Sequence, residues 1–192
     1  MMQPARLAAY DLACRRGDRL LFRGVSFELH QGDALQLAGP NGIGKSSLMR
    51  ILAGLLRSYN GHVEIDGSLA LADERPALDP HRPLGEALAF WRAIDQAGEA
   101  RADFGLEDLL DVPVRYLSTG QRKRAALARL AASGARIWLL DEPLNGLDTH
   151  WGAATQAAIE AHRALGGIAV IASHQPLQLQ KLKKLALLEH LP

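Results

Sequence analysis

The chain has 192 residues, 48% of them apolar and 22% charged, which is the balance of a folded globular protein and excludes a disordered one. Lysine and arginine number 22 against 21 aspartate and glutamate, a net charge of +1 that argues against a dedicated nucleic-acid binder, since such proteins carry a basic excess. Cys14 is the only cysteine, and no apolar run reaches the roughly 18 residues that cross a bilayer, so we expect one soluble intracellular domain without an internal disulfide.

The first third of the chain predicts strands and turns around a glycine-rich loop. Apolar and polar residues alternate over 25–29, which indicates a half-buried strand, and 34–38 is a short, mostly apolar strand. A helix is expected to begin near Lys45, because four apolar residues follow at helical spacing: Leu48, Ile51, Leu52 and Leu55. Asn60-Gly61 predicts a hairpin-type turn before a strand at 63–65.

The middle of the chain differs in character, because prolines punctuate it from Pro76 to Pro113. We expect a helix from Leu84 to about Ala97 and a second one over about 118–132. Together they predict a helical subdomain, inserted at about 76–132, with a small core of its own. The whole chain, 1–192, is then a single domain.

In the last third, two continuous apolar strands are separated by a helix. The strands are predicted at 137–140 and 168–172, and the helix at about 151–165. Apolar strands that alternate with helices indicate a parallel sheet covered on both faces. The sequence therefore predicts an α/β protein with a mostly parallel sheet core, an N-terminal antiparallel β part and a helical subdomain.

The glycine-rich loop fits the G-x-x-x-x-G-K-[ST] pattern of phosphate-binding loops at every fixed position. Its residues are Gly39, Pro40, Asn41, Gly42, Ile43, Gly44, Lys45 and Ser46, with Ser47 next in the helix. Glycines let successive backbone N–H groups face a phosphate, and the following helix presents its positive end to the same anion. The alternative is a glycine-rich turn with a solvated lysine. The predicted strand before the loop and helix after it favour phosphate binding.

Two adjacent carboxylates, Asp141 and Glu142, directly follow the apolar strand at 137–140. Burying them without cations or donors would be costly, and at the carboxyl edge of a parallel sheet they would face the crevice where ligands bind. Asp141 suits a magnesium ligand, together with the Ser46 hydroxyl, and Glu142 suits the base that activates a water. Solvated acids that cap a strand are the alternative, which the phosphate-binding loop makes the weaker one.

A third element, Leu117-Ser118-Thr119-Gly120-Gln121-Arg122-Lys123-Arg124, resembles the LSGGQ-type signature of the ATP-binding cassette (ABC) ATPases, with Thr119 at a usual glycine. Farther along, Leu144-Asn145-Gly146-Leu147-Asp148 is similar to the D-loop of that family, and Ser173-His174 to its switch histidine. Ser118 also suits a helix N-cap, and a lone histidine after a strand is often structural. The order of the motifs favours the family reading.

The resemblance implies a P-loop NTPase fold and hydrolysis of ATP with Mg²⁺. It also implies a head-to-tail homodimer formed with ATP, in which Ser118, Gly120 and Gln121 meet the γ-phosphate bound to the other copy. Asp148 would reach across that interface, while Lys45, Glu142 and His174 would act on the chain's own nucleotide. Two positions depart from the family: Arg16 stands where an aromatic residue often stacks on adenine, and Glu74 or Arg75 stands at the Q-loop glutamine.

Three stretches resemble the ATPase subunit of the cytochrome c maturation system, namely 121–130, 173–177 and Phe90-Trp91. That group implies haem export or release of a haem chaperone, integral-membrane partner subunits and a peripheral place on the cytoplasmic face of the bacterial inner membrane. Phe90-Trp91 fits a subdomain core or partner docking equally well.

Other families remain as alternatives. The closest is the ATPase of another ABC importer or exporter. A nucleic-acid-associated ABC ATPase usually has a long coiled-coil insertion or two cassettes, and neither is present, so no nucleic-acid partner is expected. A P-loop nucleotide kinase lacks the Ser118–Gln121 signature.

Overall fold

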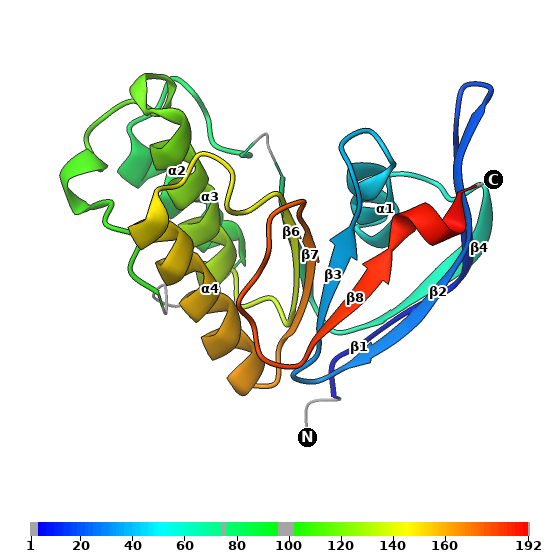
Figure 1. Cartoon of the computed structure of the whole chain (residues 1–192). Helices are drawn as coiled ribbons and strands as arrows, with labels where there is room; N and C mark the ends of the chain where they lie inside the picture. The colour runs from blue at the N-terminus through cyan, green and yellow to red at the C-terminus, as the bar shows by residue number, and fades with distance from the viewer. Residues whose placement is uncertain (1–3, 74–75, 96–101, 192) are drawn as a thin grey trace.

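The computed structural model describes residues 4–73, 76–95 and 102–191, and its strands form two sheets (Figure 1). A three-stranded antiparallel sheet has the order β2-β1-β4 and a five-stranded parallel sheet has the order β5-β6-β7-β3-β8. The strands are β1 Arg6–Arg16, β2 Arg19–His30, β3 Ala34–Ala38, β4 Asn60–Asp66, β5 Leu69–Ala72, β6 Ile137–Asp141, β7 Ile168–Ala172 and β8 Leu182–Ala186.

Helices cover the two faces of the parallel sheet unequally. Helix α1 lies between the two sheets, while α2, α3 and α4 gather on the opposite face (Figure 1). The helices are α1 Lys45–Leu52, α2 Leu84–Asp95, α3 Thr119–Ala132 and α4 Thr149–Ala164, with 3₁₀ turns η1 Glu107–Leu109, η2 Val114–Tyr116 and η3 Leu187–His190. None of the helices in the part of the chain that the structure describes is long and apolar enough to span a membrane.

The central strands β6 and β7 of the parallel sheet are buried along their whole length, which explains their nearly continuous apolar sequence. In β6, Ile137 and Leu139 face the core shared with α1 and the antiparallel sheet, whereas Trp138 and Leu140 face the core under α3 and α4. The alternation follows from the two-residue period of a strand. The predicted α/β class, with a parallel core and an N-terminal antiparallel part, is confirmed.

The helical segment does not have the separate small core that we expected. A single buried cluster joins the segment to the sheet. It contains Leu84 of α2, Phe104 and, from α3, Leu127, together with Trp138 and Leu140 of β6. Helix α3 also contacts the edge strand β5. The segment therefore packs as a continuation of the core on that face of the parallel sheet.

Helix α1 begins at Lys45, as predicted, but it ends at Leu52, so Leu55 lies outside it and is 69% exposed. The chain turns at Gly54, whose φ of 71° is in the left-handed region that glycine adopts at little cost. The Leu55 N–H then donates back to the Arg50 carbonyl oxygen at 2.8 Å. A glycine stop of this kind overrides the helical spacing of the leucines.

The predicted turn at Asn60-Gly61 is wrong, because both residues lie inside β4. They face an irregularity of β1, where Asp11 has a φ of 48° and the pairing register shifts between Tyr10 and Ala13. The Asn60 side-chain amide donates to the Asp11 carboxylate at 2.8 Å. This Asn-Gly pair thus accommodates a bulge rather than a hairpin.

We predict that Gly61→Ala lowers the free energy of unfolding by more than about 2 kcal/mol, because it adds a clash to left-handed strain. Gly61 has a φ of 78°, and a Cβ there would lie 2.1 Å from the Tyr10 carbonyl oxygen. Urea unfolding followed by tryptophan fluorescence measures the loss.

Gly134→Ala is the matched control, since Gly134 has a φ of 68° but nothing within 4 Å of an added Cβ. It should cost about 1 kcal/mol, the left-handed strain alone. Equal losses in the two variants would contradict the close approach at Gly61.

Candidate functional site

The phosphate-binding loop joins the carboxyl end of β3 to the first turn of α1. Gly39, Gly42 and Gly44 all have positive φ, at 148°, 79° and 116°, so the loop uses backbone that other residues adopt only with strain. A Cβ on Gly44 would also lie 3.1 Å from the ring of Phe22, a fully buried side chain of β2. The antiparallel sheet thus packs, through Phe22, directly against the end of the loop.

Lys45 is buried at the end of this loop, with 5% of its surface exposed. Its Nζ donates to the Gly39 carbonyl oxygen at 2.8 Å and to the Pro40 carbonyl oxygen at 3.3 Å. Backbone carbonyls of the loop therefore hold the ammonium in the position from which it would reach a bound phosphate.

Glu142 lies opposite Lys45, immediately after β6. Its Oε1 is 3.4 Å from Lys45 Nζ, and its Oε2 is 3.0 Å from Nδ1 of His174. The Glu142 N–H donates to the Ala172 carbonyl oxygen at 2.8 Å, and its φ of 47° is left-handed. The backbone thus turns sharply to direct one buried carboxylate at a cation and an imidazole. These three side chains come from the ends of β6 and β7 and from the start of α1.

Asp141, the last residue of β6, is also buried, and its backbone carbonyl accepts from Lys123 Nζ at 3.4 Å. Ser46, in the first turn of α1, is exposed. A carboxylate and a hydroxyl are oxygen donors of the kind that Mg²⁺ prefers, and Mg²⁺ in phosphate sites needs only one or two of them from protein. The donor set at the loop therefore fits that ion.

Ser118 and Gln121 form a complete capping box at the start of α3. The Ser118 Oγ accepts from the Gln121 N–H at 3.2 Å, and the Gln121 Oε1 accepts from the Ser118 N–H at 2.8 Å. Gly120 has a different reason to be glycine: a Cβ there would lie 2.8 Å from the Gly146 carbonyl oxygen. The exposed start of α3 therefore packs directly against the loop that precedes α4.

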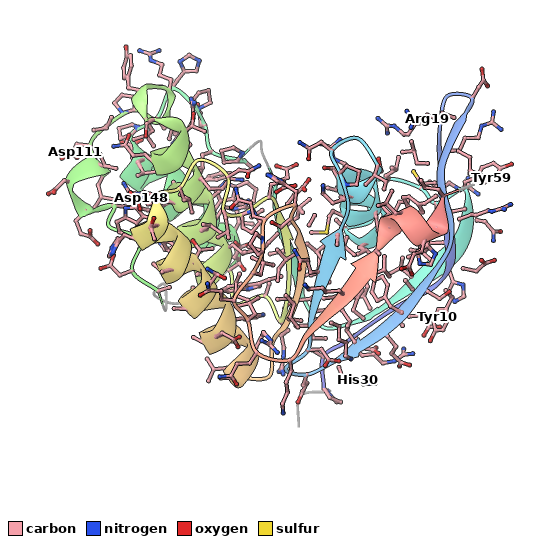
Figure 2. The ribbon with its side chains drawn as sticks, viewed as in Figure 1. Tyr10, Arg19, His30, Tyr59, Asp111 and Asp148 are labelled. Atoms are coloured by element: carbon pink, nitrogen blue, oxygen red, sulfur yellow. The ribbon has the colours of Figure 1, made fainter. Side chains whose placement is uncertain are left out.

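Asp148 caps the other exposed helix start on this side, where its Oδ1 accepts from the Trp151 N–H of α4 at 2.9 Å. Figure 2 shows Asp148 at the head of α4, on the side of the parallel sheet away from α1. A single copy does not bring the starts of α3 and α4 over its own phosphate-binding loop.

Arg16 lies at the exposed end of β1, paired with Arg19 across the hairpin that Figure 2 labels at Arg19. Its charge acts on Cys14, two residues earlier. Burial raises the pKa of the Cys14 thiol, and a hydrogen bond with Ser47 of α1 and the Arg16 charge oppose that rise. These contacts connect the hairpin to the helix of the phosphate-binding loop. The two Q-loop positions, Glu74 and Arg75, lie outside the described residues.

Phe90 and Trp91 have separate environments in the helical segment. Phe90 is 54% exposed, whereas Trp91 is packed under the guanidinium of Arg129, whose Cζ is 3.6 Å from the ring centroid. Burial lowers the pKa of Arg129, and the charge of Asp95 opposes this. A cavity of about 460 Å³ borders Trp91 and Arg129. Trp91 thus belongs to the packing of the segment, and Phe90 faces outward.

The sequence analysis assigned no contacts to three polar residues beside this site. Gln36, buried in the middle of β3, donates to the Gln175 carbonyl oxygen at 3.0 Å, and the Gln175 side chain donates to Asn145 Oδ1 at 3.1 Å. A glutamine at the centre of an apolar strand is a signal that could have found the first, since buried polar groups need partners. The Asn145–Gln175 contact joins segments remote in sequence and leaves no local pattern.

Comparisons with known proteins agree with this geometry. A protein family described as "ABC transporter" matches residues 22–145. The "Cytochrome c biogenesis ATP-binding export protein CcmA" of Novosphingobium aromaticivorans is 66% identical, over 97% of each chain. The protein of the same name from Zymomonas mobilis is 54% identical, over 95% of this chain and 85% of its own.

Solved structures extend the likeness to the fold. An ABC transporter ATP-binding protein from Pyrococcus furiosus superposes with a TM-score of 0.80 at 19% identity, over 97% of this chain and 100% of its own. An ATP-binding subunit of an ABC transporter has the same TM-score of 0.80 at 23% identity, over 88% of this chain and 79% of its own.

Proposed function

The chain belongs to the ABC transporter family, in its group of cytochrome c biogenesis ATP-binding export proteins, and we propose that the cluster of Lys45, Glu142 and His174 is where it hydrolyses ATP. The observation that carries this proposal is the Glu142 carboxylate, buried between Lys45 and His174 at the ends of adjacent parallel strands. A ligand at this crevice would meet all three side chains.

Binding begins at the phosphate-binding loop. The N–H groups of Gly42, Gly44 and the first turn of α1 would surround the β-phosphate, and Lys45 would exchange the Gly39 and Pro40 carbonyls for phosphate oxygens. Mg²⁺, held by Ser46 and Asp141, would neutralise charge on the phosphates. Arg16 would stack its guanidinium on the adenine in place of an aromatic ring.

Hydrolysis requires a base beside the γ-phosphate. When Lys45 turns to the phosphates, Glu142 loses its cation and its carboxylate is released to orient and deprotonate the attacking water. His174 lies on the other carboxylate oxygen and would contact the γ-phosphate, so it would hold both the base and the phosphoryl group under attack in place. The left-handed backbone at Glu142 maintains this direction.

The exposed starts of α3 and α4 do not lie over the phosphate-binding loop of their own chain, so we assign them to the nucleotide of a second copy. Ser118, Gly120 and Gln121 would close on the γ-phosphate bound by a second copy, head to tail, with Asp148 at the interface. The capping box leaves N–H groups of the first turn of α3 free to meet an anion.

The transport assignment follows from the relatives. We infer that the chain drives export in cytochrome c biogenesis, with haem as cargo, through integral-membrane partner subunits. It would lie peripherally on the cytoplasmic face of the bacterial inner membrane. Within this assignment the chain is one ABC ATPase domain, 1–192, and the segment at about 76–132 is its helical subdomain, with Phe90 exposed for docking.

Lys45→Ala and Glu142→Gln separate binding from chemistry. Lys45→Ala removes the positive charge that would contact the phosphates, so it should abolish most MgATP binding. Glu142→Gln keeps the shape but not the base, so it should bind MgATP while hydrolysis falls by about 100-fold or more. Calorimetry measures binding and phosphate release measures turnover. Glu189→Gln, an exposed residue of η3, is the control. Wild-type turnover in Glu142→Gln would refute the proposed base.

Affinity isolation tests the membrane partners. The full chain, tagged and purified from native membranes in mild detergent, should retain integral-membrane subunits of a cytochrome c biogenesis complex, as identified by mass spectrometry. Co-purification with the membrane subunits of a different transporter would refute the assignment while leaving the ATPase intact.

ATP-dependent dimerisation tests the role of Ser118. Glu142→Gln with ATP should be largely dimeric, because the γ-phosphate draws the helix starts together, and ADP should not sustain the dimer. Adding Ser118→Arg should return it to monomer through a clash at the start of α3. Size-exclusion chromatography with light scattering decides this. A double variant that still dimerises would show that Ser118 does not face the partner's nucleotide.

A further inference from the structure

Gln36 is the one polar residue of strand β3, and only 5% of its surface is exposed. Its neighbours Leu35 and Leu37 face the core shared with α1. The two-residue period of the strand therefore directs Gln36 toward the opposite core, to which Ala34 belongs, under α3 and α4. A buried amide on this face needs hydrogen-bond partners, because an unpaired polar group inside a protein is costly.

The partners of Gln36 are the two backbone carbonyls that flank His174. Its Nε2 donates to the Gln175 carbonyl oxygen at 3.0 Å and to the Ser173 carbonyl oxygen at 3.4 Å. A side-chain amide nitrogen carries two hydrogens, so one glutamine can serve both acceptors. Gln36 thus spans the turn at whose centre His174 lies.

Ser173 holds the same turn from within. Its N–H donates to the Leu37 carbonyl oxygen at 3.4 Å, and its Oγ accepts from the Gln175 N–H at 3.0 Å while donating to the Gln175 carbonyl oxygen at 3.2 Å. Both residues that flank His174 are therefore anchored. The His174 side chain itself is 43% exposed, so packing restrains its ring much less than burial would. The anchored backbone is what gives the imidazole its direction.

The strand that carries Gln36 also leads into the phosphate-binding loop, which begins at Gly39. Strand β3 pairs in parallel with β7, where Gln36 lies opposite Ile171, and His174 follows the end of β7. Gln36 therefore fixes the His174 turn relative to the strand from which the phosphate-binding loop leaves. At the same sheet edge, His174 Nδ1 lies 3.0 Å from Glu142 Oε2.

We propose that Gln36 is a positioning residue for ATP hydrolysis, which holds the His174 turn so that the imidazole keeps the Glu142 carboxylate aimed at the attacking water. The inference rests on the proposed function and adds to it a residue that acts through His174. Its effect is greatest once Lys45 has turned to the phosphates, because Glu142 then keeps the imidazole contact and no longer the ammonium. A misplacement of reacting groups by about 1 Å can cost about 100-fold in rate.

Gln36→Leu on the full chain tests the proposal. It keeps a similar buried volume but removes both donated hydrogen bonds, so kcat should fall by about 3- to 10-fold, the worth of one hydrogen bond. The Kd for MgATP should stay within about twofold, because the phosphate-binding loop and the magnesium ligands are unchanged. Ile171→Val, at the buried residue opposite Gln36 in β7, is the matched control. It loosens packing at the same level of the sheet without removing a hydrogen bond of the turn, and kcat should stay within about twofold.

Combination with His174→Ala shows whether Gln36 acts through the imidazole. His174→Ala should itself lower kcat, and adding Gln36→Leu should then cause no further loss beyond about twofold, because the group that Gln36 positions is gone. A glutamine that only stabilised the fold would lower the rate by the same factor in both backgrounds. Single-turnover phosphate release measures the slow variants.

Ser173→Ala loosens the same turn from within, so it decides the question if urea unfolding shows that Gln36→Leu does not fold. It removes the hydroxyl that holds Gln175 and should lower kcat by a similar factor. In the His174→Ala background it should again have no further effect.

Unchanged kcat in a folded Gln36→Leu or Ser173→Ala variant would overturn the proposal. Equal losses with and without His174, a fall in MgATP affinity in step with kcat, or wild-type kcat in His174→Ala would overturn it as well. The proposed function is judged separately: hydrolysis by the wild-type chain that persists in Lys45→Ala would refute that function. Lys45-dependent hydrolysis that Gln36→Leu leaves intact would refute only the role of Gln36.

Discussion

A buried ammonium and a buried carboxylate organise this molecule. Lys45 Nζ and Glu142 Oε1 lie 3.4 Å apart, with side chains 6% and 10% exposed. Neither charge would be tolerated there alone, because removing one partner of a buried pair leaves the other uncompensated. The pair therefore requires that the start of α1 and the end of β6 meet inside the protein, although they are far apart in the sequence.

The strand order meets that requirement. In the parallel sheet β7 lies between β6 and β3, so the carboxyl ends of all three strands share one edge. Glu142 leaves β6 there, the phosphate-binding loop leaves β3, and His174 follows β7 between them. The hydrogen bond from the Glu142 N–H to the Ala172 carbonyl oxygen ties two of these ends together at 2.8 Å. A crevice at such an edge is where parallel α/β sheets bind ligands, and here it carries both signs of charge.

How far the sequence predicts the structure depends on whether a feature is local. The phosphate-binding loop, the N-cap at Ser118 and the buried strands β6 and β7 follow from neighbouring residues, and they were predicted. Strand β1 was not, because the bulge at Asp11 interrupts its alternation, and β8 was not, because Lys183 and Lys184 make this edge strand look like a polar segment. Asn60-Gly61 looked like a turn because the structure it adopts is determined by Asp11 on the neighbouring strand β1, which is remote in the sequence. The contact between Gln175 and Asn145 was not predicted for the same reason, since it exists only in the folded chain.

The two halves of the site also differ in how complete they are. Lys45, Glu142 and His174 contact one another within one copy, and the loop glycines between β3 and α1 already have the positive φ values that expose their backbone N–H groups without a Cβ in the way. Ser118 and Asp148 are equally preorganised, each accepting a hydrogen bond from its own helix, yet both face away from any nucleotide of their own copy. Because the caps are satisfied without a partner, the exposed helix starts cost the single chain little. In the proposed head-to-tail dimer, a second copy would then need to supply only an anion at these helix starts.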